Sequence, residues 1–399
     1  MNLSRGGFLF FLLLLLADRA GAQGRDSTFN NPRDRDLIDW ITGILKFTPK
    51  ERPRKKGVIY FSVIPSTNTN QSGSKVLVSS INSGFYLGNP DSTYLSSIYF
   101  VPYTNLSHQY GFMATSNIWT ANNSWNIPGE FKIQKLSPYS YGLGSRSSSH
   151  DRFTIDYNYV RLYLTGNVRL INYFFGGFGL NYDRQYNVKL LTSPGTATSP
   201  YEQYGIGTGS SSTSTGITLN VLYDNRENSI NPDGGFYSTI VYRFNPRFIA
   251  NDNGWSSLYL DARKYFQLET QRRNIIALWG MYWASYGDVP YLNLPGTSME
   301  YNARSGRGYA LGRFRGKQML YLESEYRFTF SENGFWGGVL FANVQSFTEP
   351  LTRQFEKVNP ALGFGARLKF NKKSNTNLDI DFGFGKESFN FYINLGEIF

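Results

Sequence analysis

The residues best suited to specific chemistry are charged ones at a spacing of two. Arg307 lies in the long segment 285–317, and Glu323, Glu325 and Arg327 follow it in an alternating segment. Residues two apart in a strand point to the same face, so both carboxylates would meet the guanidinium of an Arg folded back over that strand. An Arg buried in a low-dielectric interior needs such a partner. We therefore expect a non-covalent ion-pair lock between a loop and a strand.

Catalytic and metal-binding motifs are not found in the sequence. It has no Cys, and its two His, His108 and His150, lie 42 positions apart. It contains no nucleophile elbow, zinc-protease motif, phosphate-binding loop or dinucleotide fingerprint. The glycine-rich stretches 205–209 and 383–385 are interpreted as loop and strand glycines. We predict no catalytic residue, no metal and no cofactor; a lipid hydrolase is the enzymatic alternative.

The composition is typical of a β-rich protein. Among 399 residues, 29 are Tyr, 32 are Phe and 40 are Gly, and 17% are charged. Aromatic residues favour strands. The net charge of +11 is scattered without a nucleic-acid-binding motif, so no nucleic-acid partner is expected.

The first residues predict export. Arg5 precedes the apolar run 8–17, and Ala20-Gly21-Ala22 supplies a small-x-small cleavage site, so 1–22 is predicted to be a cleaved signal peptide. A signal anchor is the alternative, but the run is shorter than a membrane span. No later run is long enough for a transmembrane helix, so entry into a membrane would require strands.

Residues 23–56 form a predicted periplasmic N-terminal segment with a short amphipathic helix. Apolar residues recur at helical spacing at Leu37, Trp40, Ile41, Ile44 and Leu45. Two interpretations stay open. The helix packs on the protein body or a lipid surface, or it docks a partner subunit.

From 57 to 399 the pattern predicts an all-β fold, a 16-stranded antiparallel transmembrane β-barrel. Sixteen alternating segments are separated by turn signals, and short connections (121–124, 165–167, 269–273, 331–334) alternate with long ones. An even strand number places both ends in the periplasm. The long loop 285–317 is expected to fold inward between strands eleven and twelve.

Alternation also predicts which residues face the lumen. Arg or Lys at the bilayer midplane costs about 2–4 kcal/mol, so the face with Glu323, Glu325 and Arg327 should point inward, and so should Asp379 and Asp381. Three tryptophans flank predicted short turns and suggest an interfacial aromatic girdle: Trp119, Trp125 and Trp336.

The final segment alternates apolar residues up to a terminal aromatic residue. It looks like the C-terminal insertion signal of bacterial outer-membrane barrels, which implies that localisation. Gly396 would weaken the pairing of this last strand and act as a gate. The predicted signal comprises Phe389, Phe391, Ile393, Leu395 and Phe399.

The ordered set of motifs resembles the superfamily of outer-membrane assembly and translocation barrels that includes BamA, TamA and the two-partner-secretion transporters. Arg307-Gly308-Tyr309 matches the loop tip that folds into those barrels. The segment from Asp224-Asn225-Arg226 to Pro232-Asp233-Gly234 is similar to a charged periplasmic turn of the family, and 361–367 to its glycine-rich late strand. The resemblance covers about 57–399.

Two departures from the family pattern change the expectations. Where the family usually has an Asp, this sequence has Asn343, which would accept a hydrogen bond from Arg307 but cannot form an ion pair. The main partner is then Glu323 or Glu325. The 34 residues of 23–56 are also too few for a polypeptide-transport-associated domain.

The resemblance implies insertion of outer-membrane proteins or translocation of polypeptides by lateral opening between the first and last strands. A passive or gated pore and a core subunit of a secretion complex are the alternatives. Expected partners are outer-membrane lipid, unfolded outer-membrane proteins, and periplasmic or lipoprotein subunits.

Overall fold

The computed structural model describes residues 34–45, 57–68, 76–104, 109–192, 199–226, 228–249, 251–269, 273–300, 304–372 and 375–399. The predicted signal peptide over 1–22, the parts 23–33 and 46–56 of the N-terminal segment, and His108 lie outside the described residues.

The described residues form one antiparallel sheet with sixteen strands of eight or more residues, as predicted. A two-residue strand, β6 (Tyr139–Ser140), pairs with β7 beyond the end of β5. The long strands are β1 (Tyr60–Asn68), β2 (Val76–Phe85), β3 (Ser96–Thr104), β4 (Tyr110–Trp119), β5 (Trp125–Leu136), β7 (Phe153–Ile171), β8 (Phe174–Thr192), β9 (Ser211–Asp224), β10 (Gly235–Asn245), β11 (Trp255–Glu269), β12 (Asn274–Gly287), β13 (Gln318–Thr329), β14 (Trp336–Phe347), β15 (Asn359–Asn371), β16 (Thr376–Gly385) and β17 (Ser388–Leu395).

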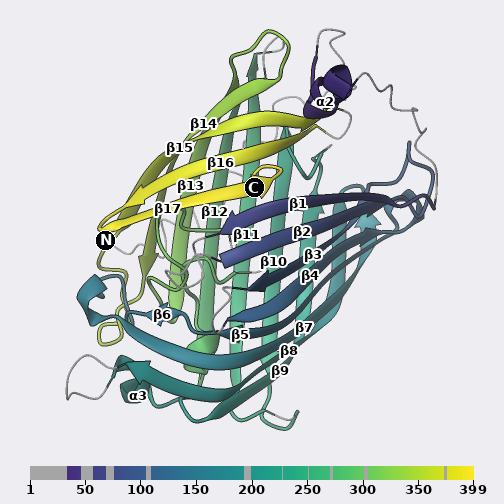
Figure 1. Cartoon of the computed structure of the whole chain (residues 1–399). Helices are drawn as coiled ribbons and strands as arrows, with labels where there is room; N and C mark the ends of the chain where they lie inside the picture. The colour runs from purple at the N-terminus through teal and green to yellow at the C-terminus, as the bar shows by residue number, and fades with distance from the viewer. Residues whose placement is uncertain are drawn as a thin grey trace.

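Each long strand pairs with the next one along the chain, and the strands curve into the wall of a barrel (Figure 1). Within the described ranges, β17 and β1 meet at one residue pair, Asn68↔Tyr392. We call the end with the 120–124 and 331–335 connections the short-turn end, and the opposite end the long-loop end.

The alternation of the strands separates two environments. In β13, Glu323, Glu325 and Arg327 are buried, whereas Tyr326 between them is exposed. In β15, Leu362 is exposed. The charged side chains therefore lie in the lumen and the exposed apolar ones face outward, as the cost of charge in lipid requires.

Two details of the short-turn end differ from the predictions. The predicted connection at 165–167 is part of β7, and the chain turns at Tyr173, whose φ is +64°. The pairing of β7 with β8 continues through this turn-like sequence because residue 177 in β8 is a glycine. A Cβ at Gly177 would lie 2.0 Å from the carbonyl oxygen of Gly166. Trp119, predicted to belong to an aromatic girdle, is buried. Its ring packs edge-on against that of Phe175, with the ring centroids 5.4 Å apart. Trp125 and Trp336 are exposed.

Two short α-helices of the described residues flank the barrel. The predicted N-terminal helix is α2 (Leu37–Leu45), which lies at the short-turn end. α3 (Pro200–Tyr204) belongs to the long connection between β8 and β9. No helix in the described ranges is long and apolar enough to cross a bilayer.

Candidate functional site

The connection between β12 and β13 folds back into the barrel and forms the candidate site. Its outgoing and returning limbs pair with each other: Thr297 N donates to the carbonyl oxygen of Phe314 at 3.0 Å, and Gly312 N to that of Thr297 at 2.9 Å. The tip is buried, with Arg307 and Tyr309 at most 1% exposed. The loop lies between the eleventh and twelfth long strands, as predicted.

Arg307 contacts three carboxylates and one aromatic ring. Its Nε donates to Glu323 Oε1 at 2.8 Å, its Nη1 to Asp381 Oδ2 at 2.8 Å, and its Nη2 to Glu323 and Glu325. The guanidinium carbon lies 3.7 Å from the ring centroid of Phe341. Several charge-assisted hydrogen bonds can offset the cost of burying a charge, so this site joins the loop to β13 and β16.

The next two residues of the tip contact the late strands. Gly308 N donates to the hydroxyl of Tyr392 in β17 at 2.9 Å, and the hydroxyl of Tyr309 donates to the carbonyl oxygen of Pro360 in β15 at 2.7 Å. The tip fits here because β16 has glycines beneath it. A Cβ on Gly383 would lie 2.6 Å from Gly308 N, and one on Gly385 2.6 Å from the Tyr309 ring.

Two contacts of Arg307 differ from those expected from the sequence. Asn343 does not accept from the guanidinium; its Nδ2 donates to the carbonyl oxygen of Arg307 at 2.9 Å. Asp381 was expected in the lumen but not as a partner of Arg307. Alternation gives the direction in which Asp381 points, but not its height relative to the loop tip, which depends on the register of β13 to β16.

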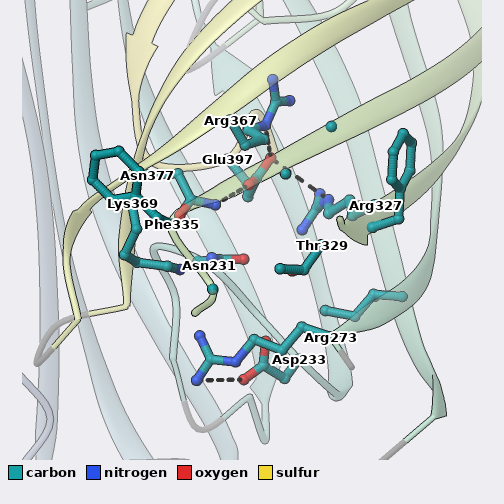
Figure 2. A pocket seen from close by; sticks show the side chains of 15 residues that line it. Asn231, Asp233, Arg273, Arg327, Thr329, Phe335, Arg367, Lys369, Asn377 and Glu397 are labelled. Atoms are coloured by element: carbon teal, nitrogen blue, oxygen red, sulfur yellow. Dashed lines mark hydrogen bonds and ion pairs between the residues drawn. The ribbon is translucent and has the colours of Figure 1, made fainter. Parts of the chain in front are cut away.

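Arg327 links the lock to the end of the chain. Its Nε donates to Glu325 Oε2 at 2.7 Å and its Nη2 to the carbonyl oxygen of Phe399 at 2.7 Å. Glu397 accepts from Arg367 Nε at 2.9 Å and from Asn377 Nδ2 at 2.8 Å. Figure 2 shows Arg327, Arg367, Asn377 and Glu397 lining one pocket.

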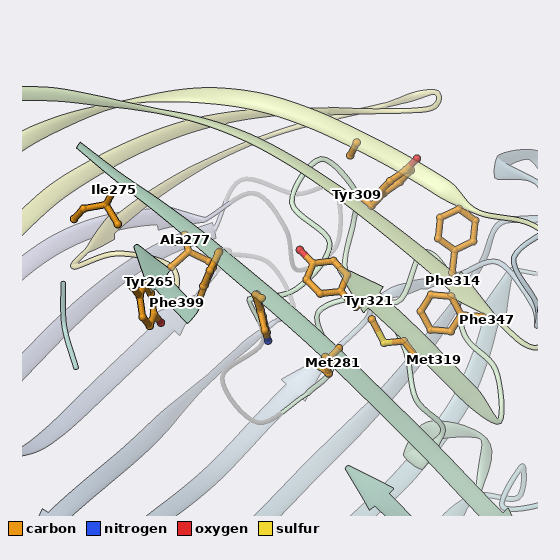
Figure 3. Close-up of a cluster of buried hydrophobic side chains, with 13 residues drawn as sticks. Tyr265, Ile275, Ala277, Met281, Tyr309, Phe314, Met319, Tyr321, Phe347 and Phe399 are labelled. Carbon is orange, nitrogen blue, oxygen red and sulfur yellow. The ribbon is translucent and has the colours of Figure 1, made fainter. Parts of the chain in front are cut away.

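Phe399 lies beyond the last strand, whereas the sequence predicted that it would end that strand. β17 ends at Leu395, and Gly396, with φ +83°, turns the chain into the lumen. Phe399 is 3% exposed and lies beside Tyr265 in a buried cluster (Figure 3). The centroid of its ring is 5.2 Å from that of Trp279. The other four residues of the predicted signal keep the alternation: Phe389 is exposed, and Phe391, Ile393 and Leu395 are half-buried.

Gly396, the predicted gate, lies beside the β9–β10 turn. A Cβ there would lie 2.7 Å from Ile230 Cγ2, and Gly396 N donates to the carbonyl oxygen of Asn377 at 2.8 Å. In the same turn, Asn231 Nδ2 donates to the carbonyl oxygen of Asn375 at 3.0 Å. The turn therefore reaches across the short-turn end to the β15–β16 connection.

A second ionic cluster lies on the opposite wall. Asp183 in β8 accepts from Arg243 Nη1 at 2.6 Å, from Arg161 Nε at 3.2 Å and from two tyrosine hydroxyls, those of Tyr159 and Tyr163. This cluster was not predicted from the sequence. Its only sequence signal is the alternation of charged and aromatic residues along β7, which does not identify their partners.

The long-loop end is filled by a separate apolar cluster. Tyr291 of the inward loop packs edge-on against Tyr201 of α3 at 5.1 Å, and its hydroxyl lies 2.7 Å from Ser140 Oγ. Side chains from the ends of β7 and β11 complete it: Phe153, Ile155, Tyr157 and Trp255.

A solved structure of BamA from Haemophilus ducreyi lacking POTRA domains 1–3 aligns with 87% of this chain and 71% of its own, at 13% identity and a TM-score of 0.54. The chain has a BamA-like fold. CdiB from Acinetobacter baumannii (12% identity, TM-score 0.50) and CdiB from Escherichia coli (10%, 0.55) align over 84% and 88% of this chain. The chain spans 59% and 63% of those CdiB chains. No family model and no curated protein matches the sequence. The predicted resemblance to BamA and its relatives is confirmed as a resemblance of fold.

Proposed function

We propose that this BamA-like chain is a non-catalytic outer-membrane barrel that inserts outer-membrane proteins or translocates polypeptides by opening between β1 and β17. The observation that carries the proposal is the seam. Among the residues that the structure describes, one pair, Asn68↔Tyr392, joins β17 to β1, whereas β17 pairs with β16 from Leu378↔Leu395 to Gly385↔Ser388. A seam with so little pairing can part, and an opened strand edge can template an incoming strand.

The inward loop supports the same mechanism. Arg307 joins the loop to β13 and β16, Tyr309 joins it to β15, and Gly308 to β17. The wall on one side of the seam is therefore braced from within. In this proposal Arg307-Gly308-Tyr309 keeps that wall rigid while the seam opens, and Gly396 lets the end of β17 bend away from β1.

A passive pore is less well supported, because side chains occupy the lumen at both levels described above. The apolar cluster around Tyr291 lies at the long-loop end, and the loop tip lies in a second buried cluster.

The chain could serve as the core subunit of a secretion complex with the same barrel and the same seam. Its partners would be unfolded outer-membrane proteins and periplasmic or lipoprotein subunits, with 1–22 removed as a signal peptide and 23–56 in the periplasm.

A reversible cross-link across the seam tests this function. Directly opposed residues of an antiparallel pair lie about 4.5–5.5 Å apart at Cα, within disulfide range, and the chain has no native Cys. The variant Asn68→Cys/Tyr392→Cys would be folded into liposomes with an unfolded small barrel protein as substrate. We expect faster insertion than with empty liposomes when the pair is reduced, loss of that acceleration on oxidation, and recovery with reductant.

The control is the single variant Tyr392→Cys, which removes the same hydroxyl but cannot cross-link. Equal insertion rates for oxidised and reduced double variant would refute lateral opening. Steady ion conductance without any acceleration of insertion would favour the pore instead.

A further inference from the structure

The helix α2 binds the barrel through its polar side. Lys372 Nζ lies 2.7 Å from Asp39 Oδ2, and Lys372 N donates to Asp36 Oδ2 at 3.0 Å. Just before the helix, Arg35 N donates to the carbonyl oxygen of Asn333 at 2.9 Å. The contacts thus reach the turns of two hairpins, β13–β14 and β15–β16.

The apolar side of α2 is left outside. Trp40 is 59% exposed and Ile44 61%, and Ile38 and Ile41 are exposed as well. With 100° between successive residues, these side chains and Leu37 lie on one broad arc, opposite the arc that holds Asp39. A surface helix of a globular protein has the reverse arrangement, with its apolar stripe toward the body.

The exposed arc adjoins the outward surface of the barrel. The Asn333 turn that holds α2 is flanked by Phe330 and Trp336, which are 63% and 45% exposed, and Phe330 N donates to the carbonyl oxygen of Trp336 at 3.2 Å. Phe330 follows the last residue of β13 and Trp336 is the first residue of β14, and both are exposed on the outward face of the barrel. The apolar arc of α2 therefore lies beside the edge of the lipid-facing surface at the short-turn end.

We propose that α2 is an interfacial anchor that lies in the phospholipid headgroup layer at the short-turn end, with its apolar arc among the acyl chains. Amphipathic helices of this kind insert their apolar face about 5–10 Å into the boundary layer, and tryptophan is favoured at that depth. The occupant of the exposed face is phospholipid, and the ion pair to Lys372 attaches the β13–β16 wall to the membrane surface. This role is independent of seam opening.

Single-cysteine labelling tests the anchor. Ile44→Cys places a probe on the apolar arc, and Gly43→Cys is the matched control: Gly43 lies one turn after Asp39, and a Cβ there meets no atom within 4 Å. Each variant would carry an NBD label and be placed, one barrel per disc, in phosphatidylcholine nanodiscs with nitroxide at acyl carbon 5 or 12. We expect blue-shifted emission and strong quenching for position 44, stronger from carbon 5 than from carbon 12, and weak quenching for position 43.

Equal quenching at 43 and 44 would overturn the proposed orientation of the helix. A blue-shifted probe at 44 that nitroxide lipids do not quench would overturn lipid as the occupant, because the apolar arc would then be covered by protein. If the emission of the probe at position 44 shifts further when two barrels are placed in one disc, the protein that covers the arc is a second copy of the chain. Heat-dependent gel migration of both variants confirms that the labelled barrels are folded.

Discussion

At the scale of single residues, Arg307 compensates the negative charge of the buried carboxylates around it. Removing it leaves Glu323, Glu325 and Asp381 buried together without that cation, and breaking a buried ion pair typically costs about 3–5 kcal/mol. We expect Arg307→Ala to lower the unfolding free energy of the barrel by about that amount, measured by urea titration in lipid. Arg307→Lys should rescue little, because a Lys cannot form the same fork of hydrogen bonds.

Glu323→Gln is the comparison for this experiment. It removes one of three negative charges but keeps an oxygen that accepts from Arg307, so its loss of stability should be smaller than that of Arg307→Ala. An unchanged urea midpoint in Arg307→Ala would show that the ion pairs do not stabilise the folded barrel.

The strand glycines make a second prediction at this scale. A Cβ on Gly385 would lie 2.6 Å from the ring of Tyr309, so Gly385→Ala should displace the tip and lower the temperature at which the barrel unfolds on a gel. Gly166→Ala is the matched control, since its Cβ would lie 3.7 Å from the nearest atom. Adding Tyr309→Ala should make the Gly385→Ala effect smaller; full additivity would contradict the proposed clash.

The sequence predicted part of this site and missed the rest for a physical reason. Strand alternation placed Glu323 and Glu325 on the lumenal face, and the Arg-Gly-Tyr resemblance brought Arg307 to them. Asp381 and the donor role of Asn343 depend on how far neighbouring strands are shifted along one another. Alternation with a period of two does not determine that shift.

At the scale of elements, the last four residues pack inside the barrel, whereas the sequence predicted that the last strand would continue to Phe399. Phe399→Ala should open a cavity beside Trp279 and cost about 3–5 kcal/mol, the usual range for a buried Phe. Phe389→Ala, on the outward face of β17, should cost less, because lipid chains can fill the space. Urea titration of the two variants in the same lipid measures the difference. Equal losses would contradict burial of Phe399.

The attachment of α2 should depend on pH. Burial opposes ionisation of Asp39, but the hydrogen bond and charge of Lys372 and the backbone N–H of Asp36 outweigh it, so the pKa of Asp39 lies below its ordinary value of 3.8. A group with a lowered pKa stabilises the folded contact above its ordinary pKa, and the contact weakens as the pH falls through the lowered value. We therefore expect α2 to stay docked at neutral pH and to detach as the pH falls through that lowered pKa.

Spin labels at Gly43→Cys and Glu332→Cys can follow this detachment. The distance distribution between them should be narrow at pH 7 and broaden under acid conditions. With Asp39→Asn as the control, the distribution should be broader at pH 7 and respond less to acid. A distribution for Asp39→Asn at pH 7 that is as narrow as that of the unmodified helix would show that the Lys372 contact does not hold α2.

At the scale of the whole molecule, the number of strands and the place of the inward loop followed from alternation and from the lengths of the connections. The error at 165–167 shows where that reasoning is limited. Thr165-Gly166-Asn167 has the composition of a turn, yet the ladder continues because Gly177 opposes it without a side chain. Whether a strand continues through such a turn-like sequence depends on the residues of the neighbouring strand.

The inward loop also has a consequence for the order of folding. Each hairpin joins neighbours in the sequence, but Arg307 meets Asp381 across 74 positions, and Ser145 meets Phe347 across 202. Contacts between distant positions form slowly, because the entropy of closing a long loop must be overcome first. The hairpins can therefore form before the loop tip, Arg307-Gly308-Tyr309, binds to the late strands. Until β16 pairs, Arg307 lacks Asp381 as a partner, and this late step of folding is the one that attaches the loop tip to the late strands.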